Sequence, residues 1–293
     1  MTRPASQGPF ARATDDVALL PVDNPYLLAV GVMLASLLQI LDSTIANVAI
    51  PHMQATLGAT PDEISWVLTS YIVAVAVAMP ITGWLADRFG SRRLFILSVA
   101  GFVLSSMLCG MAQNITEMVI FRALQGATGA FISPLSQAAM IDTNKPSRQA
   151  QMMAVWGMGI MIGPIMGPIL GGWLTENWNW RSVFYVNVPL GILSLLILTT
   201  QLPSRQILQR RFDLTGFALL AITLTSIQLL LDRGNHIDWF ASLETWIYAF
   251  LGISGAWMTL IPWALRANRC SIASCSTIPT MSRPLPSARS SAS

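Results

Sequence analysis

The feature that most constrains the fold of this chain is a series of long apolar stretches separated by short polar ones. The hydrocarbon core of a bilayer is about 30 Å thick, so a helix needs about 20 apolar residues to cross it. Eight stretches of roughly that length run over residues 26–50, 64–85, 94–111, 118–141, 152–174, 183–202, 214–231 and 243–265. The sequence therefore predicts an all-α integral membrane protein with about eight spans.

The composition excludes a water-soluble domain, because 53% of the residues are hydrophobic and only 11% are charged, against about 25% charged in typical soluble domains. The first 25 residues are polar and contain no apolar core of a secretory signal, so we expect the first span to be retained. The predicted units are a cytoplasmic tail (1–25), a six-helix half (26–202), a loop with two additional spans (203–265) and a disordered Ser-, Pro- and Arg-rich tail (266–293).

The basic residues predict how the chain is oriented. Short cytoplasmic loops of membrane proteins carry an excess of Lys and Arg. The chain contains 17 basic residues. If the N-terminus is cytoplasmic, all of them except Arg122, Arg181 and Arg233 lie on the cytoplasmic side. We therefore expect a multi-pass protein with both ends in the cytoplasm.

Asp42 and Arg122 are the charged residues that lie well inside predicted spans, where charges are costly and usually functional. At about 1.5 Å per residue, Asp42 lies about 12 Å and Arg122 about 6 Å from the outer end of its span. We predict that they pair. Contact with Arg122 keeps Asp42 ionised, whereas loss of this contact in a dry pocket favours the protonated form of Asp42. This carboxylate can then take up and release a proton; the alternative is a static ion pair that fixes helix packing.

Glycines recur at every fourth position of the fifth span, with two prolines beside them. The residues are Gly159, Gly163, Pro164, Gly167, Pro168 and Gly171. Glycines at this spacing form a groove that a neighbouring backbone can approach closely, and each proline invites a bend. We predict that the stripe faces a neighbouring helix; a tightly packed helix pair without a moving role is the alternative. The fourth span offers a matching smooth face at Ala123, Gly126, Ala127 and Ala130.

A charged loop is predicted after the second span, over residues 83–93. It contains Gly83, Asp87, Arg88, Gly90 and Arg92. Glycine permits a tight turn between two helices, and the flanking charges can bridge helix ends on the cytoplasmic face. Taken alone, this is an ordinary basic cytoplasmic loop.

Enzymatic chemistry is not indicated. The only lysine, Lys145, follows Asn144, so the sequence contains no Gly-x-x-x-x-Gly-Lys phosphate loop. His52 and His236 lie in predicted outer loops without a metal-binding pattern, and the three cysteines lack metal-ligand partners nearby. We expect neither a metal nor an organic cofactor.

Several segments, in this order, resemble the major facilitator superfamily, and within it the fourteen-span, EmrB-type drug:proton antiporters. They are residues 41–51 in the first span, 83–93 after the second, 122–126 in the fourth, 163–172 in the fifth, 180–191 at the sixth and 231–234 after the seventh. The resemblance covers roughly residues 34–265.

The resemblance implies a function and roles for particular residues. The first six helices would form one half of a rocking pair, joined to a second half by the two additional helices. Asp42 would be the protonation or cation-recognition carboxylate, Arg122 the proton-coupling arginine and Asp87 a gate residue contacting the other half. The expected activity is proton-driven multidrug efflux of hydrophobic or amphipathic compounds across the bacterial inner membrane. A periplasmic membrane-fusion adaptor and an outer-membrane channel are the implied partners, and nucleic acid is not among them.

The resemblance ends after Asn268, where a second six-helix half would follow in the family. We expect this chain alone not to export anything, and its tail to arise from a shifted reading frame or a truncation. The competing interpretation is a non-transporting membrane fragment or scaffold.

Overall fold

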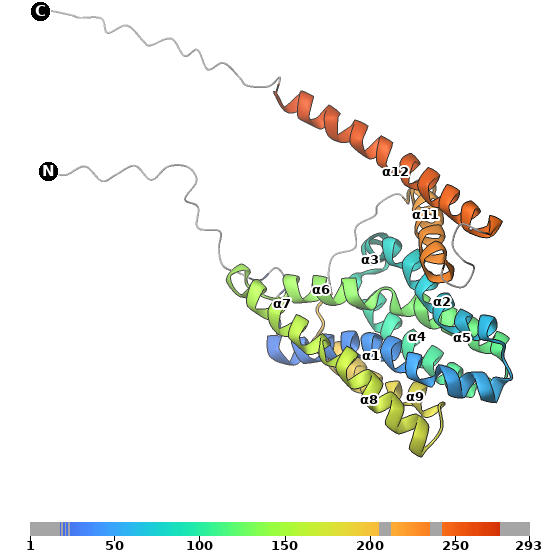
Figure 1. Ribbon diagram of the computed structural model, residues 1–293. Coiled ribbons are helices and arrows are strands. Elements are labelled where there is room, and N and C mark those ends of the chain that lie inside the picture. Colours follow the sequence, from blue (N-terminus) through green and yellow to red (C-terminus); the bar gives the residue numbers. More distant parts are fainter. Residues whose placement is uncertain are drawn as a thin grey trace, which may run out of the picture.

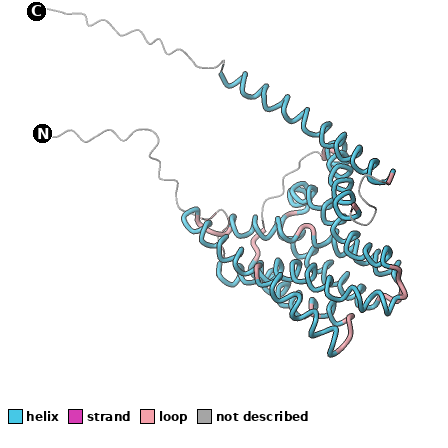
Figure 2. Tube along the Cα trace, viewed as in Figure 1, coloured by secondary structure: helices cyan, strands magenta, loops and turns pink. Residues whose placement is uncertain are grey.

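The computed structural model describes residues 18, 20, 22, 24–204, 212–234 and 242–275, apart from the side chains of 233 and 260–275. All regular structure in these residues is helical (Figures 1 and 2). The helices are α1 (Pro25–Leu57), α2 (Pro61–Ala78), the 3-10 turn η1 (Met79–Ile81), α3 (Thr82–Phe89), α4 (Ser91–Met111), α5 (Ile115–Gly129), α6 (Ile132–Asp142), α7 (Pro146–Ile160), α8 (Ile162–Asn177), α9 (Ser182–Tyr185), α10 (Asn187–Gln201), α11 (Leu214–Arg233) and α12 (Leu243–Cys275).

Seven helical segments of the described residues are long and apolar enough to cross a membrane, and they coincide with the first seven predicted spans. They are Pro25–Leu57, Pro61–Phe89, Ser91–Met111, Ile115–Asp142, Pro146–Asn177, Ser182–Gln201 and Leu214–Asp232. The eighth predicted span falls on α12, whose side chains are described only as far as residue 259. The chain is therefore a multi-pass membrane protein.

Prolines explain why several spans consist of two helices. The fourth, fifth and sixth spans break at Phe131, Met161 and Val186, each three residues before a proline. A proline lacks the N–H that would bond to the preceding turn, and its ring crowds that turn. In the fifth span the helix is thus interrupted just before Pro164, whereas Pro168 lies inside α8.

The α1 helix lies in the middle of the bundle and packs against α8, α10, α6 and α7 (Figure 1). Around it, α5 packs between α2 and α4, while α11 packs against α2 and α12. This arrangement brings the midpoint of α1 next to α5 and the start of α10, which is where the polar residues of the bundle gather.

The glycine stripe of α7 and α8 faces α1, which confirms the prediction that it meets a neighbouring helix. A Cβ atom added at Gly159 would lie 2.1 Å from Met33 Sδ, and one at Gly167 would lie 2.1 Å from Thr44 Oγ1. The opposite face of α8 carries exposed apolar side chains such as Ile165. Because these glycines carry no side chain, α8 can approach α1 closely.

The smooth face of α5 packs against α2. A Cβ atom added at Gly126 would lie 2.3 Å from the Tyr71 carbonyl oxygen, so the two backbones are in direct contact. Arg122 lies one turn earlier on α5, and this close approach brings it to the Val67 carbonyl of α2.

Two sequence expectations are wrong. Residues 83–89 do not form a loop but belong to α3, because no helix breaker lies between Gly83 and Gly90. The turn consists of Gly90, whose φ of 89° is readily adopted only by glycine. Residues 266–275 are not disordered but continue α12, although Pro262 lies inside this helix. The rest of the predicted C-terminal tail, 276–293, lies outside the described residues, as does most of the N-terminal tail.

Candidate functional site

Asp42 and Arg122 form an ion pair at the centre of the bundle. Asp42 Oδ2 lies 2.7 Å from Arg122 Nη1, and both side chains are 0% exposed. The predicted pairing is confirmed. Burial of a charge without a partner is strongly unfavourable, so each residue requires the other to remain ionised here.

Arg122 has further partners that hold its guanidinium group in place. Its Nε donates to the Val67 carbonyl at 3.3 Å, and Nη1 also donates to Gln125 Oε1 at 2.8 Å. The group lies over the Tyr71 ring, 4.3 Å from the ring centroid. A guanidinium over an aromatic face is stabilised by the ring quadrupole. Arg122 is therefore supported from α2 and α5 independently of Asp42.

Asp42 accepts two further hydrogen bonds, both at Oδ1. Gln125 Nε2 lies 2.9 Å away and Asn187 Nδ2 lies 2.6 Å away. With Arg122, these amides give the carboxylate three hydrogen-bond donors.

The sequence analysis did not single out Gln125 or Asn187. Gln125 carried a usable signal, since it lies three residues after Arg122 and therefore on the same face of α5. The only sequence signal for Asn187 was a polar residue within an apolar span. Its place beside Asp42 depends on the packing of α10 against α1.

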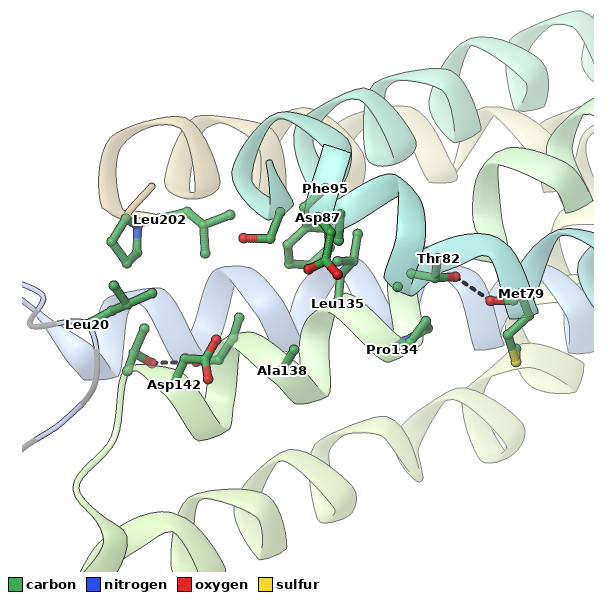
Figure 3. Close-up of a pocket in the computed structure, with 16 residues that line it drawn as sticks. Leu20, Met79, Thr82, Asp87, Phe95, Pro134, Leu135, Ala138, Asp142 and Leu202 are labelled. Carbon is green, nitrogen blue, oxygen red and sulfur yellow. Dashed lines mark hydrogen bonds between the residues drawn. The ribbon is translucent and has the colours of Figure 1, made fainter. Parts of the chain in front are cut away.

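The residues of the predicted gating loop form a separate site. Asp87 of α3 and Asp142 of α6 line a cavity of about 330 Å³, together with apolar side chains that include Phe95, Leu135 and Leu202 (Figure 3). None of these residues hydrogen-bonds to Asp42 within the described part of the chain. The structure therefore places Gly83 and Asp87 at a cavity that is separate from the buried ion pair.

Arg88 and Arg92 of this segment have different contacts. Arg92 Nη2 donates to the Thr199 carbonyl in the last turn of α10 at 2.6 Å, which confirms that a charge here bridges helix ends. The Arg88 guanidinium lies 5.1 Å from the centroid of the Trp84 ring. Both arginines thus stabilise the surface around the Gly90 turn.

The additional helix α11 is held against the second span near both of its ends. The Thr69 hydroxyl of α2 donates to the Asp232 carboxylate near the end of α11. At the other end, the rings of Trp84 and Phe212 lie 4.6 Å apart between centroids. The sequence analysis did not predict these contacts, because they join helices that are distant in the sequence.

A buried ion pair with amide donors, enclosed by apolar spans, is typical of membrane proteins that move charge or solutes. The family model described as Major Facilitator Superfamily matches residues 32–269. The chain belongs to this superfamily.

Similar proteins with named functions belong to the same branch of the superfamily that the sequence motifs indicated. Multidrug export protein EmrB of Haemophilus influenzae is 43% identical over 241 residues, which is 82% of this chain and 47% of that protein. Multidrug export protein EmrB of Escherichia coli K12 is 39% identical over the same shares. Fatty acid resistance protein FarB of Neisseria gonorrhoeae is 42% identical over 72% of this chain and 42% of its own length. The chain spans about half the length of these relatives.

Solved structures share the fold. A peptide transporter POT in complex with sulfate has a TM-score of 0.61 at 18% identity, covering 84% of this chain and 54% of that one. A D-xylose-proton symporter has a TM-score of 0.56 at 13% identity, covering 79% and 66%. At such identities the likeness concerns the fold alone.

Proposed function

We propose that this chain forms the first part of a proton-coupled multidrug efflux transporter, with Asp42 as the proton-exchanging carboxylate and Arg122 as its coupling partner. The observation that carries the proposal is the fully buried Asp42–Arg122 ion pair with its two amide donors. The similarity to the multidrug export proteins EmrB supports multidrug export as the activity. The energy source is the proton gradient, and the proposal involves no cofactor and no catalysed reaction.

Exchange at Asp42 requires that the ion pair can open at low cost. Removal of one partner from a buried pair typically costs about 3–5 kcal/mol. Protonation of Asp42 avoids an isolated negative charge, and the Val67 carbonyl, the Gln125 oxygen and the Tyr71 ring remain to stabilise Arg122. A bound hydrophobic cation favours the ionised form of Asp42 and so releases its proton.

Alternating access requires two halves that rock about a shared site near the middle of the membrane. We place Asp87 and the turn at Gly90 at the gate between the halves, with Gly83, Arg88 and Arg92 as its support. The glycine stripe of α7 and α8 permits close contact with α1 during this movement.

The complete transporter would lie in the bacterial inner membrane with a cytoplasmic N-terminus. A periplasmic adaptor and an outer-membrane channel are its proposed partners. Residues 1–293 expressed alone are expected to bind substrate without efflux, because the second half is needed for access from the other side.

Substrate-induced proton release tests the proposal. The chain is purified into nanodiscs, a fluorescent hydrophobic cation is added in weak buffer at a pH low enough for Asp42 to be protonated, and the pH change is recorded with a soluble indicator. We expect proton release with binding, and loss of that release in Asp42→Asn. Asp62→Asn is the matched control, since Asp62 is an exposed carboxylate at the start of α2. Cation binding without proton release, or equal release from Asp42→Asn, contradicts the proposal.

A further inference from the structure

Asn187 has an incomplete set of hydrogen bonds in this site. It is the first residue of α10, directly after the break that follows α9. Its Nδ2 donates to Asp42 Oδ1 at 2.6 Å and to Ser106 Oγ at 2.9 Å. Its side chain is 0% exposed, and Oδ1 has no hydrogen-bond partner among the described residues. A buried, unused acceptor is rare enough to require an explanation.

The ionised state of Asp42 explains the orientation of this amide. An ionised carboxylate only accepts hydrogen bonds. Arg122 Nη1, Gln125 Nε2 and Asn187 Nδ2 all point donors at it. The Asn187 oxygen is left over because Asp42 has no proton to offer it.

Protonation turns Asp42 from an acceptor into a donor, because a protonated carboxyl group donates a hydrogen bond and requires an acceptor. Gln125 Oε1 already accepts from Arg122 Nη1 at 2.8 Å and from Cys109 Sγ at 3.5 Å. Asn187 Oδ1 is the unused acceptor on a side chain that already contacts Asp42. A half-turn about the Cβ–Cγ bond exchanges Nδ2 and Oδ1 and directs the oxygen at the carboxyl proton.

We propose that Asn187 is a positioning residue that senses the protonation state of Asp42 by this half-turn. It donates to the carboxylate when Asp42 is ionised and accepts from the carboxyl group when Asp42 is protonated. The inference rests on the proposed function, in which Asp42 exchanges protons.

Ser106 extends this switch to the break in the sixth span. Its hydroxyl accepts from Asn187 Nδ2 and donates to the Phe184 carbonyl of α9 at 2.9 Å. A serine hydroxyl rotates freely between acceptors. After the half-turn it faces the Asn187 oxygen and turns toward it, which releases the Phe184 carbonyl two residues before the break at Val186.

The protonated state is less well satisfied than the ionised state in this helix arrangement. The half-turn moves Nδ2 to the position where Oδ1 had no partner, and the Phe184 carbonyl loses the Ser106 hydroxyl and keeps only the Val186 N–H. Buried polar groups without partners are costly.

The other titratable groups that interact with Asp42 do not provide this switch. They are Arg122 on α5, Tyr71 on α2 and Cys109 on α4. Arginine remains charged at all physiological pH values, and tyrosine and cysteine are ordinarily neutral there. Asp42 is therefore the group whose charge changes, and Asn187 is the neighbour able to respond by exchanging a donor for an acceptor.

Infrared difference spectroscopy tests the inference directly. The purified chain, with isotope-labelled asparagine, is recorded in nanodiscs while the pH is lowered. We expect a protonated-carboxyl band that is absent in Asp42→Asn, and a shift of one asparagine side-chain carbonyl band with the same midpoint. Asn187→Leu should remove the shifting band, with Asn187→Ser as the substitute if the first variant does not fold. Asn177→Leu is the control, since Asn177 is exposed.

The two proposals fail in different ways. If the Asp42 carboxyl band titrates while the Asn187 band stays constant, the switch is wrong and the proposed function stands. If no band sensitive to Asp42→Asn titrates, Asp42 does not exchange protons, and both proposals are overturned.

Discussion

Replacement of Gly167 by alanine tests how tightly α8 is packed against α1. The added Cβ would lie 2.1 Å from Thr44 Oγ1 and 2.8 Å from Thr44 Cβ. Rotation of the Thr44 side chain can move Oγ1 but not Cβ, whose position is fixed by the backbone. Because carbon atoms pack at about 3.5–4.0 Å, the two helices must separate by about 1 Å.

The expected cost follows from this separation. Overpacking of a well-packed interior typically costs about 1–3 kcal/mol. Gly172→Ala is a matched control on the same helix, because a Cβ added there has no atom within 4 Å. Any gain in helix propensity, at most about 1 kcal/mol, is common to both variants. The difference between them therefore isolates the contact with α1.

The assay is reversible unfolding of the purified chain in mixed micelles, followed by circular dichroism. We expect Gly167→Ala to be less stable than Gly172→Ala by about 1–3 kcal/mol. Equal stability of the two variants would refute the close packing of α8 on α1 and the structural interpretation of the glycine stripe.

Three further predictions concern the ion pair, the turn and the additional helix. Asp42→Asn should destabilise the chain in the same assay by less than the roughly 3–5 kcal/mol typical of a broken buried pair, because the Val67 carbonyl, the Gln125 oxygen and the Tyr71 ring still hold the charged Arg122; combining it with Arg122→Gln should restore part of this loss, and no recovery would contradict the coupling. Gly90→Ala should destabilise by about 1–2 kcal/mol because its φ is positive, whereas Gly83→Ala should not, as a Cβ there meets nothing within 4 Å. Thr69→Val should weaken the docking of α11 by roughly 1 kcal/mol, seen as faster proteolysis after α10; an unchanged rate would argue against that hydrogen bond.

The ion pair shows how far a sequence alone can lead. Depth in the membrane follows from counting residues along a helix, since each adds a fixed rise. That count brought Asp42 and Arg122 to similar levels, and the structure confirms their contact. The amide donors Gln125 and Asn187 were not predicted, because depth does not say which side of a helix faces which neighbour.

The segment around Gly90 shows the opposite case. Its charges and glycines suggested a loop over residues 83–93, but α3 continues to Phe89. Charged residues are compatible with an exposed helix end, so polarity alone does not separate a helical turn from a loop. The part of the prediction that held is the tight turn at a glycine, since the turn lies at Gly90, whose φ is positive.

The sequence by itself determined the number and positions of the first seven spans, the level of the two buried charges and the closeness of the glycine-rich helix to a neighbour. These properties depend on hydrophobicity, rise and side-chain size, which are local to each segment. Only the tertiary structure decided that α1 is the partner of the glycine stripe, that α11 lies against α2 and that Asn187 reaches Asp42. Those contacts depend on how the shapes of several helix surfaces fit together at once, and no single segment contains that information.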